Sequence, residues 1–143
     1  MKPFTQEIVS YLKDNRVCVL AVALSTGVPH ASTVHYAYDE ASGLFVFETH
    51  HEYRKLEPFQ KKPQVSASLV VGSDERTLRT LQVDGVCELL SPDAPQIAYY
   101  MDVFPEKQGK YEEQKLVFFT FTPHWWRFTD WAQREGKRVD ISE

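Results

Sequence analysis

A cluster of charged side chains lies between residues 50 and 62 of the 143-residue chain. The net charge of this stretch is +2, whereas the whole chain carries −4, so the remaining residues carry −6. Thr49 precedes the cluster, and a hydroxyl, backbone N–H groups and cations at the start of a helix together suit a phosphate group. The alternative interpretation, solvated basic residues on a surface helix, stays open at this point. The charged residues are Glu52, Arg54, Lys55, Glu57, Lys61 and Lys62.

The histidines do not form a recognisable metal or proton-transfer motif. His50 and His51 are adjacent, so they point in different directions on a helix or a strand, and no third ligand stands at zinc-site spacing. His30 and His35 lie five apart on one predicted strand, which places them on opposite faces. The sequence also lacks the GxSxG, HExxH, Walker and GxGxxG signatures. We therefore expect neither a metal centre nor a nucleophilic triad.

Two adjacent tryptophans, Trp125 and Trp126, form the third chemical feature. Neighbouring residues of a strand face opposite sides of the sheet, so one indole can pack inward while the other borders a cleft or a subunit interface. Packing of both rings in the interior is the alternative interpretation.

The elements that must position these residues are mostly strands. Apolar, β-branched and aromatic runs alternate with turn residues such as those at 25–29 and 39–43. Gly85 interrupts one of these runs, which indicates a bulge or a sharp bend. The absence of regular strand–helix alternation favours an antiparallel barrel with peripheral helices. The predicted strands are 17–24, 30–38, 44–49, 64–71, 77–90, 116–121 and 125–131.

Three helical segments are expected around this barrel. Apolar residues between positions 4 and 12 share one helical face, with Thr5 as the N-cap. A short helix is expected over 52–57, and Pro58 should end or kink it. A further helix should use Ser91 as its N-cap and Pro92 as its first residue, and should run to position 104. Residues 132–143 form a polar tail.

Composition sets outer limits on the protein class. The 43% of hydrophobic residues is typical of one globular domain over 1–143, and the net charge of −4 argues against a general nucleic-acid surface. We interpret Cys18 and Cys87, which lie in apolar runs, as small buried thiols. No export signal or membrane span is evident, so we expect a cytoplasmic protein. Aromatic residues make up 13% of the chain, and most of these rings should lie in the barrel core.

The order of these pieces resembles the pyridoxamine 5'-phosphate oxidase-like family of FMN-binding split barrels. The likeness spans most of the chain and is strongest where a strand ending in threonine is followed by a basic pair. The matching segments are VCVLAVAL at 17–24, GVPHASTV at 27–34, LFVFET at 44–49, YRK at 53–55, KPQVS at 62–66 and RTLQVDG at 79–85.

This resemblance implies a mostly β fold, a six- to seven-stranded antiparallel Greek-key split barrel with peripheral helices, and a homodimer with FMN at its interface. Arg54 and Lys55 would bind the FMN phosphate, and Thr49 would bind the phosphate or the ribityl chain. Thr80 or Gln82 would bond the polar edge of the flavin ring. The other residues that the resemblance implies near the cofactor, some through backbone groups, are His30, Ser32, Thr33, Val34, Glu48 and Trp125.

The same resemblance implies an FMN-dependent oxidoreductase of small molecules. His30 and His35 stand where the vitamin oxidases have arginine and lysine, and the C-terminal substrate motif of those enzymes is not found in 131–143. These departures argue against pyridoxamine phosphate oxidation more than against FMN binding. A non-catalytic flavin- or haem-binding module and a deazaflavin-dependent reductase of the same superfamily remain the alternatives.

Overall fold

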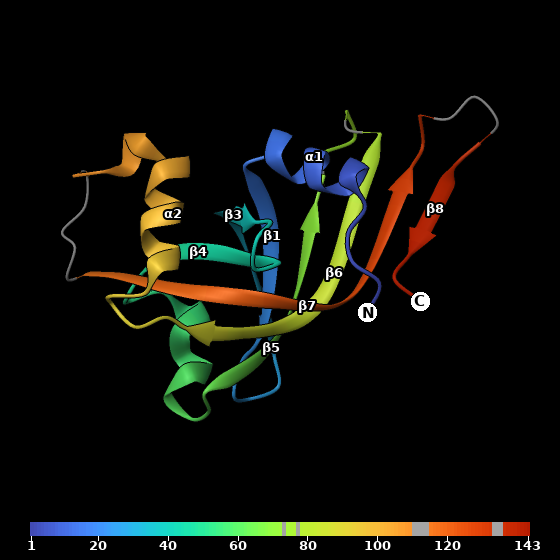
Figure 1. The fold of residues 1–143 in the computed structure, drawn as a ribbon. Helices are drawn as coiled ribbons and strands as arrows, with labels where there is room; N and C mark the ends of the chain where they lie inside the picture. The colour runs from blue at the N-terminus through green and yellow to red at the C-terminus, as the bar shows by residue number, and fades with distance from the viewer. Residues whose placement is uncertain (73, 77, 110–114, 133–135) are drawn as a thin grey trace.

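The computed structural model describes residues 1–72, 74–76, 78–109, 115–132 and 136–143, and Figure 1 shows how their elements are arranged. The helical elements are α1 (Gln6–Asp14), α2 (Pro95–Val103) and the 3-10 helices η1 (Arg54–Gln60) and η2 (Pro105–Lys107). The strands are β1 (Val17–Ala23), β2 (Pro29–His35), β3 (Ala37–Asp39), β4 (Leu44–His50), β5 (Gln64–Val71), β6 (Arg79–Leu89), β7 (Leu116–Asp130) and β8 (Arg138–Ile141).

The described strands form one curled antiparallel sheet in the order β2-β1-β5-β6-β7-β4-β3. The long strand β7 pairs with β6 along most of its length. On its other edge, the first half of β7 pairs with β4 and the last residues pair with β8. The architecture confirms the predicted fold class, a mostly β antiparallel split barrel with peripheral helices.

The interior of the barrel follows the strand alternation. On β5, Val65, Ala67, Leu69 and Val71 are buried, while Ser66 and Ser68 between them are exposed. The rings of Phe47 and Phe119 stack with their centroids 5.1 Å apart. The expected aromatic core is confirmed, because Phe45, Phe47, Phe119 and Phe121 are all buried.

Helix α1 lies against one end of this core (Figure 1). Its N-cap is Thr5, as predicted, and the Thr5 hydroxyl accepts a hydrogen bond from the backbone N–H of Ile8 at 3.3 Å. The helix buries Ile8, Val9 and Leu12 in the core and ends at Asp14. Burial of these side chains, rather than helix propensity, accounts for its stability.

The two cysteines are free and buried in the same core, as predicted. Burial raises the pKa of the Cys18 and Cys87 thiols to about 12. Both side chains therefore remain thiols at neutral pH and behave as small apolar residues. Within the described residues, no helix has the length and apolarity that a membrane crossing would require.

Helix α2 covers the other face of β4, where Tyr100 and Phe104 pack on Val46 and Ala37. The predicted start of this helix at Ser91 is wrong, because α2 begins at Pro95 with Ala94 as its N-cap. Ala94 is extended, with φ −64° and ψ 136°. A residue before proline disfavours helical backbone, so the helix cannot run from Ser91 through Ala94.

The short helix predicted over 52–57 is a 3-10 helix, η1, and it continues to Gln60. Of the two predicted effects of Pro58, an end or a kink, the end is wrong, because Pro58 lies inside the helix. Pro58 removes one backbone donor, yet it is buried and its carbonyl accepts from the N–H of Lys61 at 3.1 Å. The tighter i to i+3 hydrogen bonding of a short 3-10 helix tolerates the proline that would break a long α-helix.

Three strand predictions differ from the structure. The strand predicted over 30–38 divides into β2 and β3 at Tyr36, whose backbone N–H donates to the carbonyl of Arg16 at 3.1 Å. The predicted tail contains the short strand β8, which pairs with β7. The strand predicted over 77–90 is observed from Arg79 to Leu89, and residue 77 lies outside the described residues.

Strand β7 is continuous through Thr122-Pro123-His124, where two separate strands were expected. The reason is a register shift between Asp84 and Gly85 of β6, so that Gly85 pairs with Pro123 and Asp84 with Trp125. A bulge frees one residue from regular pairing and lets a proline sit inside a strand. The bulge predicted at Gly85 is confirmed, and it accounts for Pro123 as well.

Gly85 permits this close approach because it has no side chain. A Cβ added there would overlap the backbone carbonyl of Thr122 and crowd the ring of Phe121. Gly43 is a matched contrast, since it has a positive φ of 73° but open space around an added Cβ.

We expect Gly85→Ala to lower the free energy of unfolding by about 3 kcal/mol, the upper part of the usual range for overpacking, because strands β6 and β7 must separate. Gly43→Ala should cost only about 1–2 kcal/mol, the cost of a left-handed backbone for alanine. Urea unfolding of both variants measures the difference. Equal or smaller destabilisation by Gly85→Ala would contradict the packing argument.

Candidate functional site

The segment from Thr49 to Lys55 connects the end of β4 to η1. The backbone N–H of Tyr53 donates to the carbonyl of His50 at 3.0 Å, and this bond turns the chain into η1. Leu56 and Phe59 of η1 pack against the barrel core. On its other side, η1 is fixed to the turn between β1 and β2, where the backbone N–H of Ser25 donates to Glu57 Oε2 at 3.1 Å. The segment is therefore held at both ends.

Lys55 is a buried cation without a matching anion. Its relative exposure is 6%, and no carboxylate within the described residues lies at salt-bridge distance from its ammonium group. The Nζ atom lies 4.7 Å from the centre of the Tyr53 ring. Burial lowers the pKa of Lys55, and the negative charge of Glu48 opposes part of that effect. A buried unpaired ammonium is costly, so this position favours an anionic ligand.

Two buried hydroxyl oxygens of the predicted site residues also lack partners within the described residues. Thr49 is 3% exposed, and its Oγ1 atom has no hydrogen-bond partner within the described residues. The same holds for Ser32 Oγ on β2. A buried polar atom without a partner costs about 1–3 kcal/mol, so native structures rarely keep one without a use. Both hydroxyls can bond to a ligand that supplies oxygen atoms.

Glu48 and Arg54 are placed differently from the buried residues Thr49 and Lys55 that follow them in the sequence. Glu48 lies on the α2 side of β4, where its carboxylate is 3.3 Å from the ammonium of Lys107. Arg54 is exposed at the start of η1. The structure thus brings Thr49, Arg54 and Lys55 onto one short segment and directs Glu48 toward α2.

The predicted residues of β2 divide between the two faces of the sheet. His30, Ser32 and Val34 pair directly with the buried Val22, Leu20 and Cys18 of β1, and so face the barrel interior. The side chain of Val34 packs against the core. Thr33 is exposed on the outer face. Of these four, Val34 has only its backbone available to a ligand.

The remaining predicted residues lie on the outer face of the sheet. The strand registers align Ala21, Ser68, Asp84 and Trp125 in one row across four strands. The adjacent row consists of Val19, Val70, Gln82 and Arg127. Thr80 follows on the same face of β6, where its hydroxyl donates to the carbonyl of Gly72 at 3.3 Å.

The tryptophan pair divides as expected for adjacent strand residues. Trp126 is fully buried, and its indole N–H donates to the carbonyl of Lys2 at 2.8 Å. Trp125 is half-buried on the outer face, in register with Asp84. Trp125 is therefore the ring of this pair that remains open to a ligand or a subunit.

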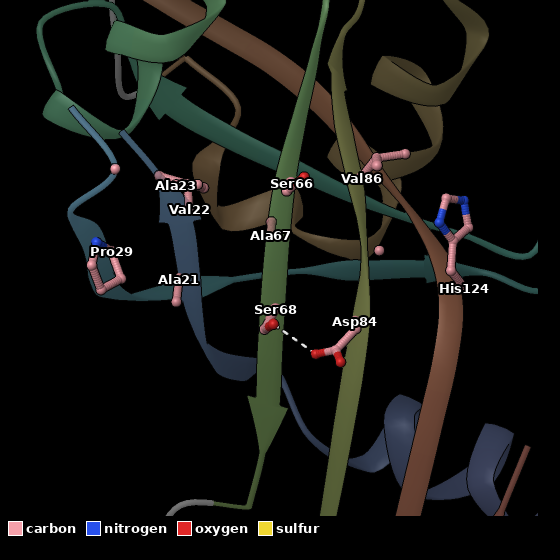
Figure 2. Close-up of a pocket in the computed structure, with 12 residues that line it drawn as sticks. Ala21, Val22, Ala23, Pro29, Ser66, Ala67, Ser68, Asp84, Val86 and His124 are labelled. Carbon is pink, nitrogen blue, oxygen red and sulfur yellow. Dashed lines mark hydrogen bonds between the residues drawn. The ribbon is translucent and has the colours of Figure 1, made fainter. Parts of the chain in front are cut away.

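A groove of about 460 Å³ crosses the outer face, and Figure 2 shows its lining. Its floor is made of small side chains such as Ala21, Ala23 and Ser66. Ser68 donates a hydrogen bond to Asp84 at 2.6 Å, and His124 borders the groove from β7. Sequence reasoning missed Asp84 and His124, although the Asp84-Gly85 pair and the Pro123 turn signal marked the bulge that directs them outward.

Apart from Glu48 and the residues of β2, the predicted residues thus form two groups in different parts of the chain. The first group, on β4 and η1, carries the buried cation and the partnerless Thr49 hydroxyl. The second group, on β6 and β7, carries Gln82 and Trp125 on the open outer face. Among the described residues, no three His, Cys, Asp or Glu side chains gather closely enough to hold a metal ion.

Solved structures of similar fold belong to proteins whose names mention different ligands. An FMN-binding, pyridoxamine 5'-phosphate oxidase-related protein from Nostoc punctiforme matches with a TM-score of 0.65 and 12% identity, over 95% of this chain and 88% of its own. An FAD-binding protein from Mesorhizobium loti matches with a TM-score of 0.64 and 23% identity, over 87% and 93%. HutZ, the haem storage protein from Vibrio cholerae, matches with a TM-score of 0.62 and 16% identity, over 85% and 91%. At these identities the likeness establishes the fold.

Sequence comparison establishes the family. No curated protein matches the sequence. The family model described as pyridoxamine 5'-phosphate oxidase matches residues 4–130, which is most of the chain and includes every residue of both groups. The chain therefore belongs to the pyridoxamine 5'-phosphate oxidase family.

Proposed function

We propose that this protein binds FMN and acts as an FMN-dependent oxidoreductase on a small molecule. The observation that carries the proposal is the buried, unpaired ammonium of Lys55 on the same short segment as the partnerless hydroxyl of Thr49. A phosphate group satisfies both, since it supplies negative charge and several acceptor oxygens. Similarity in fold to the FMN-binding protein from Nostoc punctiforme supports the choice of cofactor.

The phosphate would be held by one buried and one exposed cation. Lys55 supplies charge in a desolvated position, where an ion pair is stronger than in water. Arg54, exposed at the start of η1, can add a bidentate contact to the oxygens. Thr49 Oγ1 would donate to a third oxygen. Glu48 would border this phosphate site from the α2 side of β4.

The flavin supplies the electron and hydride chemistry, while the protein binds and orients it. Backbone and polar groups of His30, Ser32, Thr33 and Val34 would line the cofactor along β2. Thr80, Gln82 and Trp125 would contact the ring. These last residues lie on the outer face of the sheet, away from the phosphate segment, so we propose that a second copy of the chain brings its outer face to complete the site.

Three features of the outer face support a homodimer. The floor of the groove on this side is made of small side chains such as Ala21, Ala23 and Ser66. The Nε atom of Arg127 is buried without a hydrogen-bond partner within the described residues. The exposed carboxylate of Asp84 in a second copy would suit that guanidinium. We accordingly propose one split-barrel domain over residues 1–143, paired through this face.

The cofactor assignment predicts which variant loses binding. Lys55→Met keeps the apolar stem and removes the charge, so it should weaken FMN binding by about 1.5–3 kcal/mol, roughly ten- to a hundredfold. Fluorescence titration with FMN measures the affinity, and riboflavin, which has no phosphate, should bind equally to both proteins.

Lys61→Met is the matched control, because Lys61 is an exposed lysine just beyond η1. Absence of FMN binding by the native protein would refute the proposed function, and mass spectrometry of any copurified ligand would then identify haem or a deazaflavin. FMN binding that is unaffected by Lys55→Met would refute the phosphate assignment alone.

The Thr49 hydroxyl provides a second test, because it should destabilise the protein without cofactor but stabilise the complex with FMN. Thr49→Val removes a buried polar atom without a partner, so the protein without cofactor should be equally stable or more stable by up to about 1 kcal/mol. FMN affinity should nevertheless fall by about 1 kcal/mol. Thermal unfolding with and without FMN measures both. A variant that loses stability without cofactor would show that the hydroxyl serves the fold.

The dimer proposal predicts the effect of a bulky charge on the outer face. Ala21 lies on the outer face between β2 and Ser68 of β5. The bulky charge introduced by Ala21→Arg should therefore separate the two facing sheets, and the variant should sediment as a monomer in sedimentation velocity. Ser10→Arg, on the exposed side of α1, is the control and should leave the native assembly intact. A native protein that sediments as a monomer with FMN bound would exclude the shared site.

A further inference from the structure

A small network of polar groups connects β4 to the C-terminal side of α2. The ammonium of Lys107 lies 3.3 Å from Glu48 Oε2 and donates to the hydroxyl of Tyr100 at 2.7 Å. The Tyr100 hydroxyl lies 3.5 Å from the same carboxylate oxygen. The side chains of Lys107 and Glu48 are only 15% and 11% exposed, so water screens this ion pair weakly.

Lys107 is held in place by aromatic rings as well as by the carboxylate. Its ammonium lies 4.8 Å from the ring centre of Phe104 and 5.2 Å from that of Tyr100. The guanidinium of Arg16 lies 4.5 Å from the Phe104 ring and pairs with Glu106 of η2. Since η2 is only three residues long, these contacts are what fix its lysine against β4.

Glu48 pairs with Lys107 and also acts through its charge on Lys55. It directly precedes Thr49 on β4, and Lys55 follows on η1 after a short turn. Glu48 is the carboxylate whose charge acts on Lys55 among the described residues. Only Lys107 forms the ion pair with it, however, and Lys55 is left without a salt bridge within the same residues.

The charge of Glu48 therefore acts on both ammonium groups, although among the described residues only that of Lys107 lies within salt-bridge distance. If Lys107 did not occupy Glu48, the charge of Glu48 would be uncompensated in a poorly hydrated position beside the phosphate site. It would then attract Lys55 and repel a phosphate dianion, and both effects act against binding. The ion pair with Lys107 on the α2 side compensates this charge.

We propose that Lys107 is a positioning residue of the phosphate site, because it holds the Glu48 carboxylate on the α2 side and thereby leaves the Lys55 ammonium free for an anion. This inference rests on the proposed function, since it takes the phosphate of FMN as the ligand of Lys55. It assigns to α2 and η2 a role in cofactor affinity although no residue of theirs touches the phosphate.

A substitution can remove the charge of Lys107 and keep its apolar stem. Lys107→Met keeps the apolar contacts with Tyr100 and Phe104, and should lower FMN affinity roughly five- to tenfold, the effect of one uncompensated charge at moderate screening. Riboflavin affinity should not change. Lys107→Arg keeps the charge and should bind FMN like the native protein. Lys107→Gln replaces the methionine variant if the latter does not fold.

The double variant separates charge from structure. Glu48→Gln introduced into Lys107→Met removes the carboxylate that the lysine restrains, so FMN affinity should return to within about twofold of the native value. A merely structural role of Lys107 predicts no such rescue, together with equal losses for FMN and riboflavin. Either of those two results would overturn the proposal.

The outcome for the native protein separates this inference from the function on which it rests. A native protein that does not bind FMN would overturn both. A native protein that binds FMN, loses it in Lys55→Met and keeps it in Lys107→Met would overturn the role of Lys107 alone. The expected pattern is loss in both single variants and rescue only in the double variant that contains Glu48→Gln.

Discussion

The antiparallel ladder between β6 and β7 is the interaction on which the other parts of the structure depend. Along its first half, β7 also pairs with β4, which ends in the phosphate segment. Along its second half, the same ladder presents Gln82 and Trp125 on the outer face. The bulge at Gly85 stands between the two halves and lets the carbonyl of Thr122 approach β6 closely. One ladder thus sets the relative positions of both groups of site residues.

The phosphate segment illustrates how a fold can hold groups that do not stabilise it. Burial of an unpaired lysine and of a partnerless hydroxyl both oppose folding, so the packing around them must compensate. That packing comes from Leu56 and Phe59 on η1 and from the hydrogen bonds between Ser25 and Glu57. Because the segment is fixed before a ligand arrives, little ordering entropy is lost on binding.

Sequence reasoning predicted the parts of this protein that depend on local pattern. A continuous apolar run located β1, the turn residues before Leu44 helped to locate β4, strand alternation located β5, and the glycine at position 85 indicated the bulge. Order and spacing located the basic pair, but its unequal burial depends on how η1 packs, which no local pattern encodes. The continuity of β7 through Pro123 depends on a partner strand about 40 residues earlier, and the pairing of Glu48 with Lys107 joins residues 59 positions apart. Contacts of this kind are set by tertiary packing and remain hidden in a single sequence.

The pairing of β4 with β7 has a consequence for how the chain folds. Phe45 of β4 pairs with Phe121 of β7, so this edge of the barrel can close only when a much later part of the chain is available. Non-local pairing of this kind slows folding, because a long loop must close before any contact rewards it. During synthesis, β4 would present an apolar edge until β7 leaves the ribosome, and an unpaired apolar edge invites aggregation. The strand that carries the phosphate segment is thus also the one most in need of protection while the protein is being made.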